Sequence, residues 1–177
     1  MRGDPTDWSS EAIVNDTDGW LLHQRGLAAT IVRKGGPEIR RQSDEWIHYQ
    51  GEVKVGSAVW TTAGNLSSRF IIHTVGPDVS YRWLTQQQQL ELRQTVRSAL
   101  AVADDLEVTS VAIPAISTGP GRCYPRRLAA REIVAECLQY CDDCPATTLR
   151  LIVLMNEDEL TTSIFAKALK EERQRRQ

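Results

Sequence analysis

The chain has 177 residues, of which 41% are hydrophobic and 25% charged, and its formal net charge is −2. This length favours one domain with its own core, and the near-neutral charge argues against general attraction to nucleic acid or anionic membranes. No run approaches the roughly 18 apolar residues of a membrane span, and no apolar segment typical of a secretory signal opens the chain. We therefore expect an intracellular protein, cytoplasmic or nuclear, that does not bind membranes.

The first part of the chain alternates short apolar runs with helix-like segments. Residues 12–15 form an apolar run that ends in Asn15. Gly35-Gly36-Pro37 separates the helix-like segments 31–33 and 39–49, because glycine commonly ends a helix and proline commonly begins one. Extended structure is expected over 53–62.

The alternation continues to the C-terminus. The clearest helix covers 84–105, where Thr85 and Gln88 match a capping box and the apolar residues share one face. Further strands are expected at 70–74, 108–113 and 149–155, and further helices at 126–140 and from about residue 157. This pattern predicts a layered α/β domain. The polar residues 171–177 are expected to fray in solvent.

Three of the predicted strands end in small or polar residues. Asn15 closes the first, His73-Thr74-Val75-Gly76-Pro77 closes the second, and Val111–Ile113 leads into Pro114-Ala115-Ile116-Ser117-Thr118-Gly119. A loop of small residues between a strand and a helix can bind an anion, because its backbone N–H groups are free and the helix dipole favours negative charge. We expect a ligand site at the carboxyl ends of the strands.

These segments, in this order, resemble the macrodomain family, an α/β module that binds ADP-ribose. The family pattern runs through Gly-Asp-Ile, Ala-Ile-Val-Asn-Ala-Ala-Asn, a glycine-rich loop, His-Thr-Val-Gly-Pro and Pro-Ala-Ile-Ser-Thr-Gly. The resemblance extends from about residue 3 to about residue 169 and implies a three-layer α/β/α domain, 1–170, followed by a polar tail. It also implies a mixed sheet of about five strands. The family's usual first edge strand is missing, either because it is absent or because the sequence is a fragment.

The resemblance assigns binding roles near the start of the chain. Asp4, followed by Pro5, aligns with the aspartate that accepts a hydrogen bond from the adenine amino group. Asn15 keeps the first asparagine of the family's Asn-Ala-Ala-Asn, whereas Asp18 replaces the second. A carboxylate there can accept hydrogen bonds from ribose hydroxyls but would repel a nearby phosphate.

The glycine-rich loop departs furthest from the family pattern. Gln24-Arg25-Gly26 stands where the family has three glycines, and Leu27 follows. Arg25 could pair with the pyrophosphate or could fill the ribose pocket, and both alternatives stay open. Hydrolytic members of the MacroD type have an aspartate after the glycines, but here Leu27 and Ala28 cannot deprotonate a water molecule.

The second phosphate loop and the last strand supply the other expected contacts. Ser117, Thr118 and Gly119 would offer backbone N–H groups to the diphosphate, whereas Pro120 removes one donor. Tyr124 could pack against a ribose, Arg122 could add positive charge, and Met155 could lie against the adenine ring. The residues of these two segments that we expect at the ligand are Ser117, Thr118, Gly119, Pro120, Gly121, Arg122, Tyr124, Met155 and Asn156.

Cys137, Cys141 and Cys144 have the spacing of an iron–sulfur ligand set, but they fall at the end of a helix-like segment, and we interpret them as reduced thiols. We expect no metal and no cofactor. The leading hypothesis is a reader of ADP-ribose or mono-ADP-ribosylated protein. The alternatives are an ADP-ribosyl hydrolase and a degenerate macrodomain that serves as a protein-interaction scaffold. Nucleic-acid binding is not expected, and the sequence does not indicate an oligomeric state.

Overall fold

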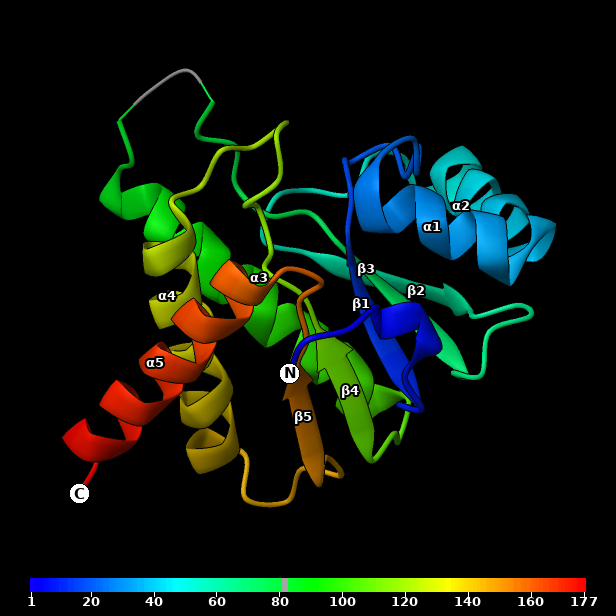
Figure 1. The fold of residues 1–177 in the computed structure, drawn as a ribbon. Coiled ribbons are helices and arrows are strands. Elements are labelled where there is room, and N and C mark those ends of the chain that lie inside the picture. Colours follow the sequence, from blue (N-terminus) through cyan, green and yellow to red (C-terminus); the bar gives the residue numbers. More distant parts are fainter. Residues whose placement is uncertain (81–82) are drawn as a thin grey trace.

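The computed structural model describes residues 1–80 and 83–177. Helices pack on both faces of a central five-stranded sheet, with α1 and α2 on one side and α3, α4 and α5 on the other (Figure 1). This is the three-layer α/β/α arrangement with a mixed sheet that the sequence predicted. The strands are β1 (Ala12–Asp16), β2 (Ala58–Thr62), β3 (Phe70–Thr74), β4 (Ser110–Ile113) and β5 (Leu151–Leu154). The helices are α1 (Gly26–Gly35), α2 (Pro37–Gln50), α3 (Gln86–Asp105), α4 (Arg126–Asp143) and α5 (Glu159–Arg175), with a short 3-10 helix, η1, at Pro5–Asp7.

The sheet order is β2-β3-β1-β4-β5, so the first strand in sequence is the central one. β1 pairs in parallel with β3 and β4, and β4 pairs in parallel with β5. Among the strands of residues 1–80 and 83–177, only β2 runs antiparallel to its neighbour, β3. Beside β5, the start of the chain adds a single parallel bridge between Arg2 and Asn156 rather than a further strand.

The core lies on both faces of the sheet. The larger apolar cluster joins β1, β3 and β4 to α3, α4 and α5, and includes Val14, Ile72 and Leu100. A smaller cluster joins the opposite face to α1 and α2 through Ile13, Ile31 and Ile39. The strands therefore bury apolar residues at successive positions, because both of their faces are covered.

Local sequence signals explain most of the element boundaries. Thr85 and Gln88 form the predicted capping box at the start of α3. Gly36, with φ of 87°, ends α1, and Pro37 begins α2. The expected extended segment 53–62 is a strand only from Ala58, because the chain turns just before it, where Ser57 N–H donates to Lys54 O over 3.0 Å.

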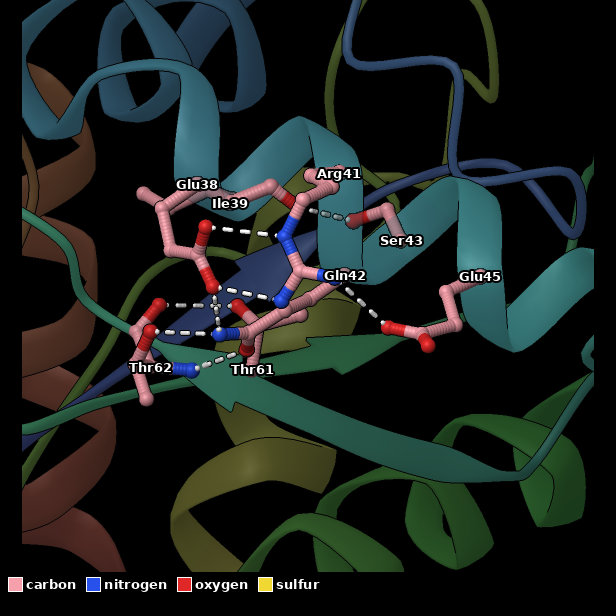
Figure 2. Close-up of polar contacts among 8 residues, drawn as sticks. All are labelled: Glu38, Ile39, Arg41, Gln42, Ser43, Glu45, Thr61 and Thr62. Atoms are coloured by element: carbon pink, nitrogen blue, oxygen red, sulfur yellow. Dashed lines mark hydrogen bonds and ion pairs between the residues drawn. The ribbon is translucent and has the colours of Figure 1, made fainter.

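The outer edge of β2 is covered by a side chain of α2. Thr62 N–H donates to Gln42 Oε1 over 2.8 Å, and Gln42 Nε2 donates to Thr62 Oγ1 over 2.9 Å (Figure 2). Glu38 accepts from both Gln42 and Arg41, which lowers the pKa of Glu38 to about 2. The Gln42 side chain thus occupies the backbone N–H of Thr62 at the edge of the sheet. This hydrogen bond discourages a strand of another chain from pairing with β2 at this point.

The C-terminal residues differ from the expectation that they fray. α5 stays helical to Arg175, and Arg176 bonds Glu172 and Asp142 and donates to Ala135 O on α4. All four cysteines are free, and burial raises the pKa of the Cys137 thiol. Within 1–80 and 83–177, no set of three potential metal ligands gathers, and no helix is long and apolar enough to cross a membrane.

Candidate ligand-binding site

The candidate site lies where the parallel strands β1, β3, β4 and β5 end on the same side of the sheet, near the top of Figure 1. We call this region the carboxyl edge and define it by residues 17–25, 75–80, 114–125 and 155–158. Parallel strands bring their following loops together at one edge. The predicted site residues in these segments are therefore brought to one edge of the fold, although Asp18 and Asn156 are 156 − 18 = 138 positions apart in the sequence.

Asp4 joins the carboxyl edge because the N-terminal segment runs beside the end of β5, where Gly3 N–H donates to Asn156 O over 2.9 Å. Asp4 Oδ1 caps η1 by accepting from Thr6 N–H at 2.8 Å and from Thr6 Oγ1 at 2.6 Å. Lys34 Nζ donates to Oδ2 at 2.9 Å. These donors and the Lys34 charge lower the pKa of Asp4 against the opposing effect of partial burial. An ionised carboxylate has about four acceptor positions. Asp4 uses three of them for Thr6 and Lys34, so one remains for the exocyclic amine of a base. Pro5 is buried at the first position of η1.

Asn15 is fully buried and contacts two histidine rings. Its Nδ2 lies 3.0 Å from His73 Nδ1 and 3.4 Å from His23 Nδ1. Because an amide NH2 group only donates, both Nδ1 atoms must accept, and each ring proton then sits on Nε2. The two Nε2 atoms lie 2.9 Å from Ser43 Oγ and 3.0 Å from Thr61 Oγ1.

The hydroxyls continue the same chain of donors. Ser43 Oγ donates to Ile39 O over 2.8 Å, and Thr61 Oγ1 donates to Thr62 O over 3.0 Å (Figure 2). Burial lowers the pKa of His73 well below its usual value, and burial together with the nearby Arg40 charge lowers the pKa of His23 to about 4. Two neutral rings therefore orient the Asn15 amide and connect the loop after β1 to α2 and β2.

Asp16, the last residue of β1, links the first loop to the second phosphate loop. Its Oδ2 accepts from Ser117 N–H at 2.7 Å. Burial raises the pKa of the Asp16 carboxyl, while the Arg122 charge opposes this shift. Arg122 donates to Thr17 O over 2.7 Å and also to Gly76 O. Asp16 and Arg122 together connect the ends of β1, β3 and β4.

The rest of the first loop is more exposed. Asp18 Oδ1 accepts from Trp20 N–H at 2.8 Å, so this carboxylate caps its own turn. Gln24 and Arg25 are exposed, and Arg25 is the N-cap residue of α1 without a side-chain hydrogen bond to the helix. Gly26 begins α1 with φ of 55°, and a Cβ there would meet no atom within 4 Å. Leu27 packs against the smaller apolar cluster.

The second phosphate loop is tightly folded at its start and open at its tip. Ser117 is buried with φ of 62°, and Thr118 Oγ1 donates to Ala115 O over 2.9 Å. Pro120 is exposed, and Gly119 and Gly121 have open space where a Cβ would be. Tyr124, by contrast, is 1% exposed in the larger apolar cluster, and burial raises its pKa to about 12. A contact between its ring and a ribose stays a prediction and would require the ring to become exposed.

Met155 and Asn156 follow β5 and are both buried. Asn156 Oδ1 accepts from Ala115 N–H at 3.1 Å, which ties the end of β5 to the loop after β4. The Met155 sulfur lies 3.7 Å from the position that a Cβ on Gly3 would occupy. The Asp4 segment and the end of β5 are therefore adjacent, as a shared adenine site requires.

The sequence reasoning missed several residues that shape this region. Asp16 received no role because the family pattern has alanine at its position, and Lys34 has no local signal because its partner Asp4 is distant in sequence. His23 and His73 have no local signal that predicts their shared contact with Asn15. A charged residue at the end of an otherwise buried strand, such as Asp16, is the one signal that could have drawn attention.

Several buried polar atoms at the carboxyl edge have no hydrogen-bond partner within the described ranges. Seven such side-chain atoms occur in residues 1–80 and 83–177. Five of them belong to residues in or directly before the carboxyl edge: Asn15 Oδ1, Asp16 Oδ1, Ser117 Oγ, Tyr124 Oη and Asn156 Nδ2. Buried polar groups are usually satisfied, so this concentration indicates a site that a polar ligand or water completes.

The fold and the site together define a class of protein: a three-layer α/β/α domain with a polar binding edge at the carboxyl ends of a mixed sheet. The Macro domain family model matches residues 14–147, and the chain belongs to this family. An uncharacterized protein of Pyrobaculum aerophilum is 37% identical over 158 residues, which cover 89% of this chain and 84% of that protein. Human protein mono-ADP-ribosyltransferase PARP14 is 32% identical over 178 residues, which cover 96% of this chain and 9% of PARP14.

Solved structures agree with this membership. A mutant of the Oceanobacillus iheyensis macrodomain with ADPR has a TM-score of 0.90 and 30% identity, covering 98% of this chain and 91% of that chain. The Trypanosoma brucei macrodomain in complex with ADP-ribose has a TM-score of 0.81 and 26% identity, covering 95% of this chain and 67% of that chain. The predicted family and fold are therefore confirmed.

Proposed function

We propose that this chain binds ADP-ribose at the carboxyl edge, either free or attached to a protein. The observation that carries the proposal is the gathering of unpartnered buried polar atoms in Asn15, Ser117 and Asn156 at this edge. These atoms are one acceptor, one hydroxyl that can donate or accept, and one donor, which suits a ligand with ribose hydroxyls. The macrodomain structures with ADPR and ADP-ribose support the same ligand.

The proposed ligand extends along the edge from the N-terminal segment to the first loop. Adenine lies beside Asp4, Met155 and Asn156, and the Asp4 carboxylate accepts from its amino group. The diphosphate faces the backbone N–H groups of the second phosphate loop, where φ is positive at Ser117 and no side chain crowds Gly119. The far ribose lies near the first loop, where Arg25 is exposed.

We propose binding rather than turnover. Leu27, Ala28 and Ala29 follow the glycine that begins α1, and none of these side chains can activate water. The relation to a mono-ADP-ribosyltransferase supports an ADP-ribosylated protein as the natural partner. ADP-ribose is a ligand here, not a cofactor, and an intracellular location stays a prediction.

Isothermal titration with ADP-ribose, using AMP as the comparison ligand, tests this proposal. We expect saturable binding of ADP-ribose that is tighter than that of AMP, because the second ribose and phosphate add contacts. Asp4→Ala should weaken ADP-ribose binding by about 1–2 kcal/mol through loss of the adenine hydrogen bond.

The matched control is Asp7→Ala. Asp7 Oδ1 lies 2.6 Å from Lys34 Nζ, so this carboxylate also pairs with Lys34, but its side chain is largely exposed. Its effect should stay below about 0.5 kcal/mol, because exposed ion pairs contribute little. Absence of any saturable binding at millimolar ADP-ribose would reject the proposed function. Equal effects of the two substitutions would reject the adenine contact at Asp4.

A further inference from the structure

The second phosphate loop already holds a carboxyl group from its own chain. Asp16 Oδ2 accepts from Ser117 N–H at 2.7 Å, and Ser117 is fully buried with φ of 62°. This amide is the first N–H of the Ser117–Gly119 segment. Backbone amides of such a loop are suited to a phosphate oxygen. The carboxylate therefore occupies a donor that a ligand's diphosphate would otherwise use.

The residue that makes this contact departs from the family pattern. Asn15 and Asp18 align with the two asparagines of Asn-Ala-Ala-Asn, so Asp16 stands in the place of an alanine. A methyl group can neither accept a hydrogen bond nor carry charge. The side chain at this position thus decides whether the Ser117 amide is free.

The nearby cation compensates for the carboxylate only in part. Arg122 acts electrostatically on Asp16, but its terminal nitrogens donate to the carbonyl groups of Thr17 and Gly76. Asp16 Oδ1 is shielded from solvent and accepts no hydrogen bond of good geometry among the described residues, although the nearby Gly76 backbone amide acts to lower the pKa of this carboxyl. In its ionised form, this carboxylate repels a second anion more strongly than an exposed carboxylate does, because the charge is held out of water.

We propose that Asp16 is a specificity-determining residue that competes with the ligand's diphosphate for Ser117 N–H. It lowers the affinity for ligands with phosphates at this loop and leaves recognition to the nucleoside and ribose contacts. This inference rests on the proposed function, because it concerns the same site. Its consequence is that the affinity for ADP-ribose is limited by the chain's own carboxylate.

Two substitutions separate the charge of Asp16 from its hydrogen bond. Asp16→Ala frees the Ser117 amide and removes the carboxyl group. We expect this variant to bind ADP-ribose and ADP about 3- to 10-fold more tightly, which is the effect of one hydrogen bond on affinity. Asp16→Asn keeps an oxygen for the amide and removes only the charge, so its gain should be smaller. Adenosine has no phosphate, and its affinity should not change.

The control is Asp105→Asn, because Asp105 is an exposed carboxylate at the end of α3 and its loss changes the net charge equally. Titration calorimetry gives the affinities, and thermal unfolding shows that each variant is folded. A tighter complex of both Asp16 variants with ADP-ribose, absent for adenosine and for Asp105→Asn, supports the inference.

Binding of ADP-ribose by the wild type with unchanged or weaker binding by both Asp16 variants would overturn the inference and would identify Asp16 as neutral or as a ligand contact. Failure of all the folded proteins to bind ADP-ribose would overturn the proposed function, and the inference with it. If Asp16→Ala does not fold, the test rests on Asp16→Asn alone. The inference then still requires that Asp16→Asn bind ADP-ribose more tightly than the wild type does, with no change in its affinity for adenosine.

Discussion

At the scale of single residues, the buried Asn15 and the two histidines explain how a polar cluster can lie inside the fold. Every nitrogen of the two rings has a partner, and the direction of each hydrogen bond is fixed by the fact that an amide NH2 only donates. The rings must be neutral for this arrangement. A protonated ring would place an N–H against the Asn15 NH2 group, so that two donors would face each other in this orientation of the amide.

Stability should therefore fall in mildly acidic solution. Above pH about 6.5 His23 is neutral in both the folded and the unfolded chain, so its low pKa has no effect. Because its folded pKa is about 4, the unfolded chain takes up a proton between pH 6.5 and 4 that the folded chain does not. His23 should then lower the free energy of unfolding by about 1–3 kcal/mol across this range.

Urea unfolding at several pH values measures this effect. His23→Asn should reduce stability at pH 7, because it breaks the contacts with Asn15 and Ser43, and it should flatten the decline between pH 6.5 and 4. His48→Asn is the control, since His48 is an exposed histidine of α2. An unchanged slope in His23→Asn would show that His23 does not cause the decline.

At the scale of elements, the loops that follow β3 and β4 approach each other very closely. A Cβ on Gly76 would lie 2.2 Å from Ser117 Oγ and 2.8 Å from Ile116 Cγ2. Only glycine permits this contact, and Gly76 O also accepts from Arg122. The position of the second phosphate loop thus depends on the absence of a side chain in the loop after β3.

Gly76→Ala should displace Ser117 and weaken the fold by about 1–3 kcal/mol, as overpacking of buried sites does. Urea unfolding would show this loss, and the affinity for ADP-ribose should fall as well. Gly121→Ala serves as the control, because a Cβ there has no atom within 4 Å. Equal free energies of unfolding for the two variants would mean that the second phosphate loop moves to accommodate the added methyl group without loss of stability.

At the scale of the whole molecule, much of the fold could be predicted, because apolar runs and capping signals are local. The capping box of α3, the strand at 70–74 and the turn at Gly35-Gly36-Pro37 all follow from neighbouring residues. For the candidate site, the sequence predicts which segments take part but not which side chains contact one another. The contacts of Asp16 with Ser117 and of Lys34 with Asp4 join distant residues. Tyr124 lies in the predicted loop, but its ring is buried in the core.

The C-terminal residues show the same limit at the surface. Their polar composition predicts fraying, yet partners on another helix hold Arg176. Such partners depend on how α4 and α5 pack, which no short sequence window contains.

The most direct test of the central claim is to locate ADP-ribose on the folded protein by following backbone amide resonances during a titration. We predict saturating shifts at Asp4, at Ser117 to Gly119 and at Asn156, with little change in the second half of α5. Shifts gathered instead around the cavity of about 310 Å³ that Arg93, Arg131 and Arg176 help to line between α3, α4 and α5 would contradict a site at the carboxyl edge. The absence of shifts at millimolar ligand would contradict ADP-ribose binding itself.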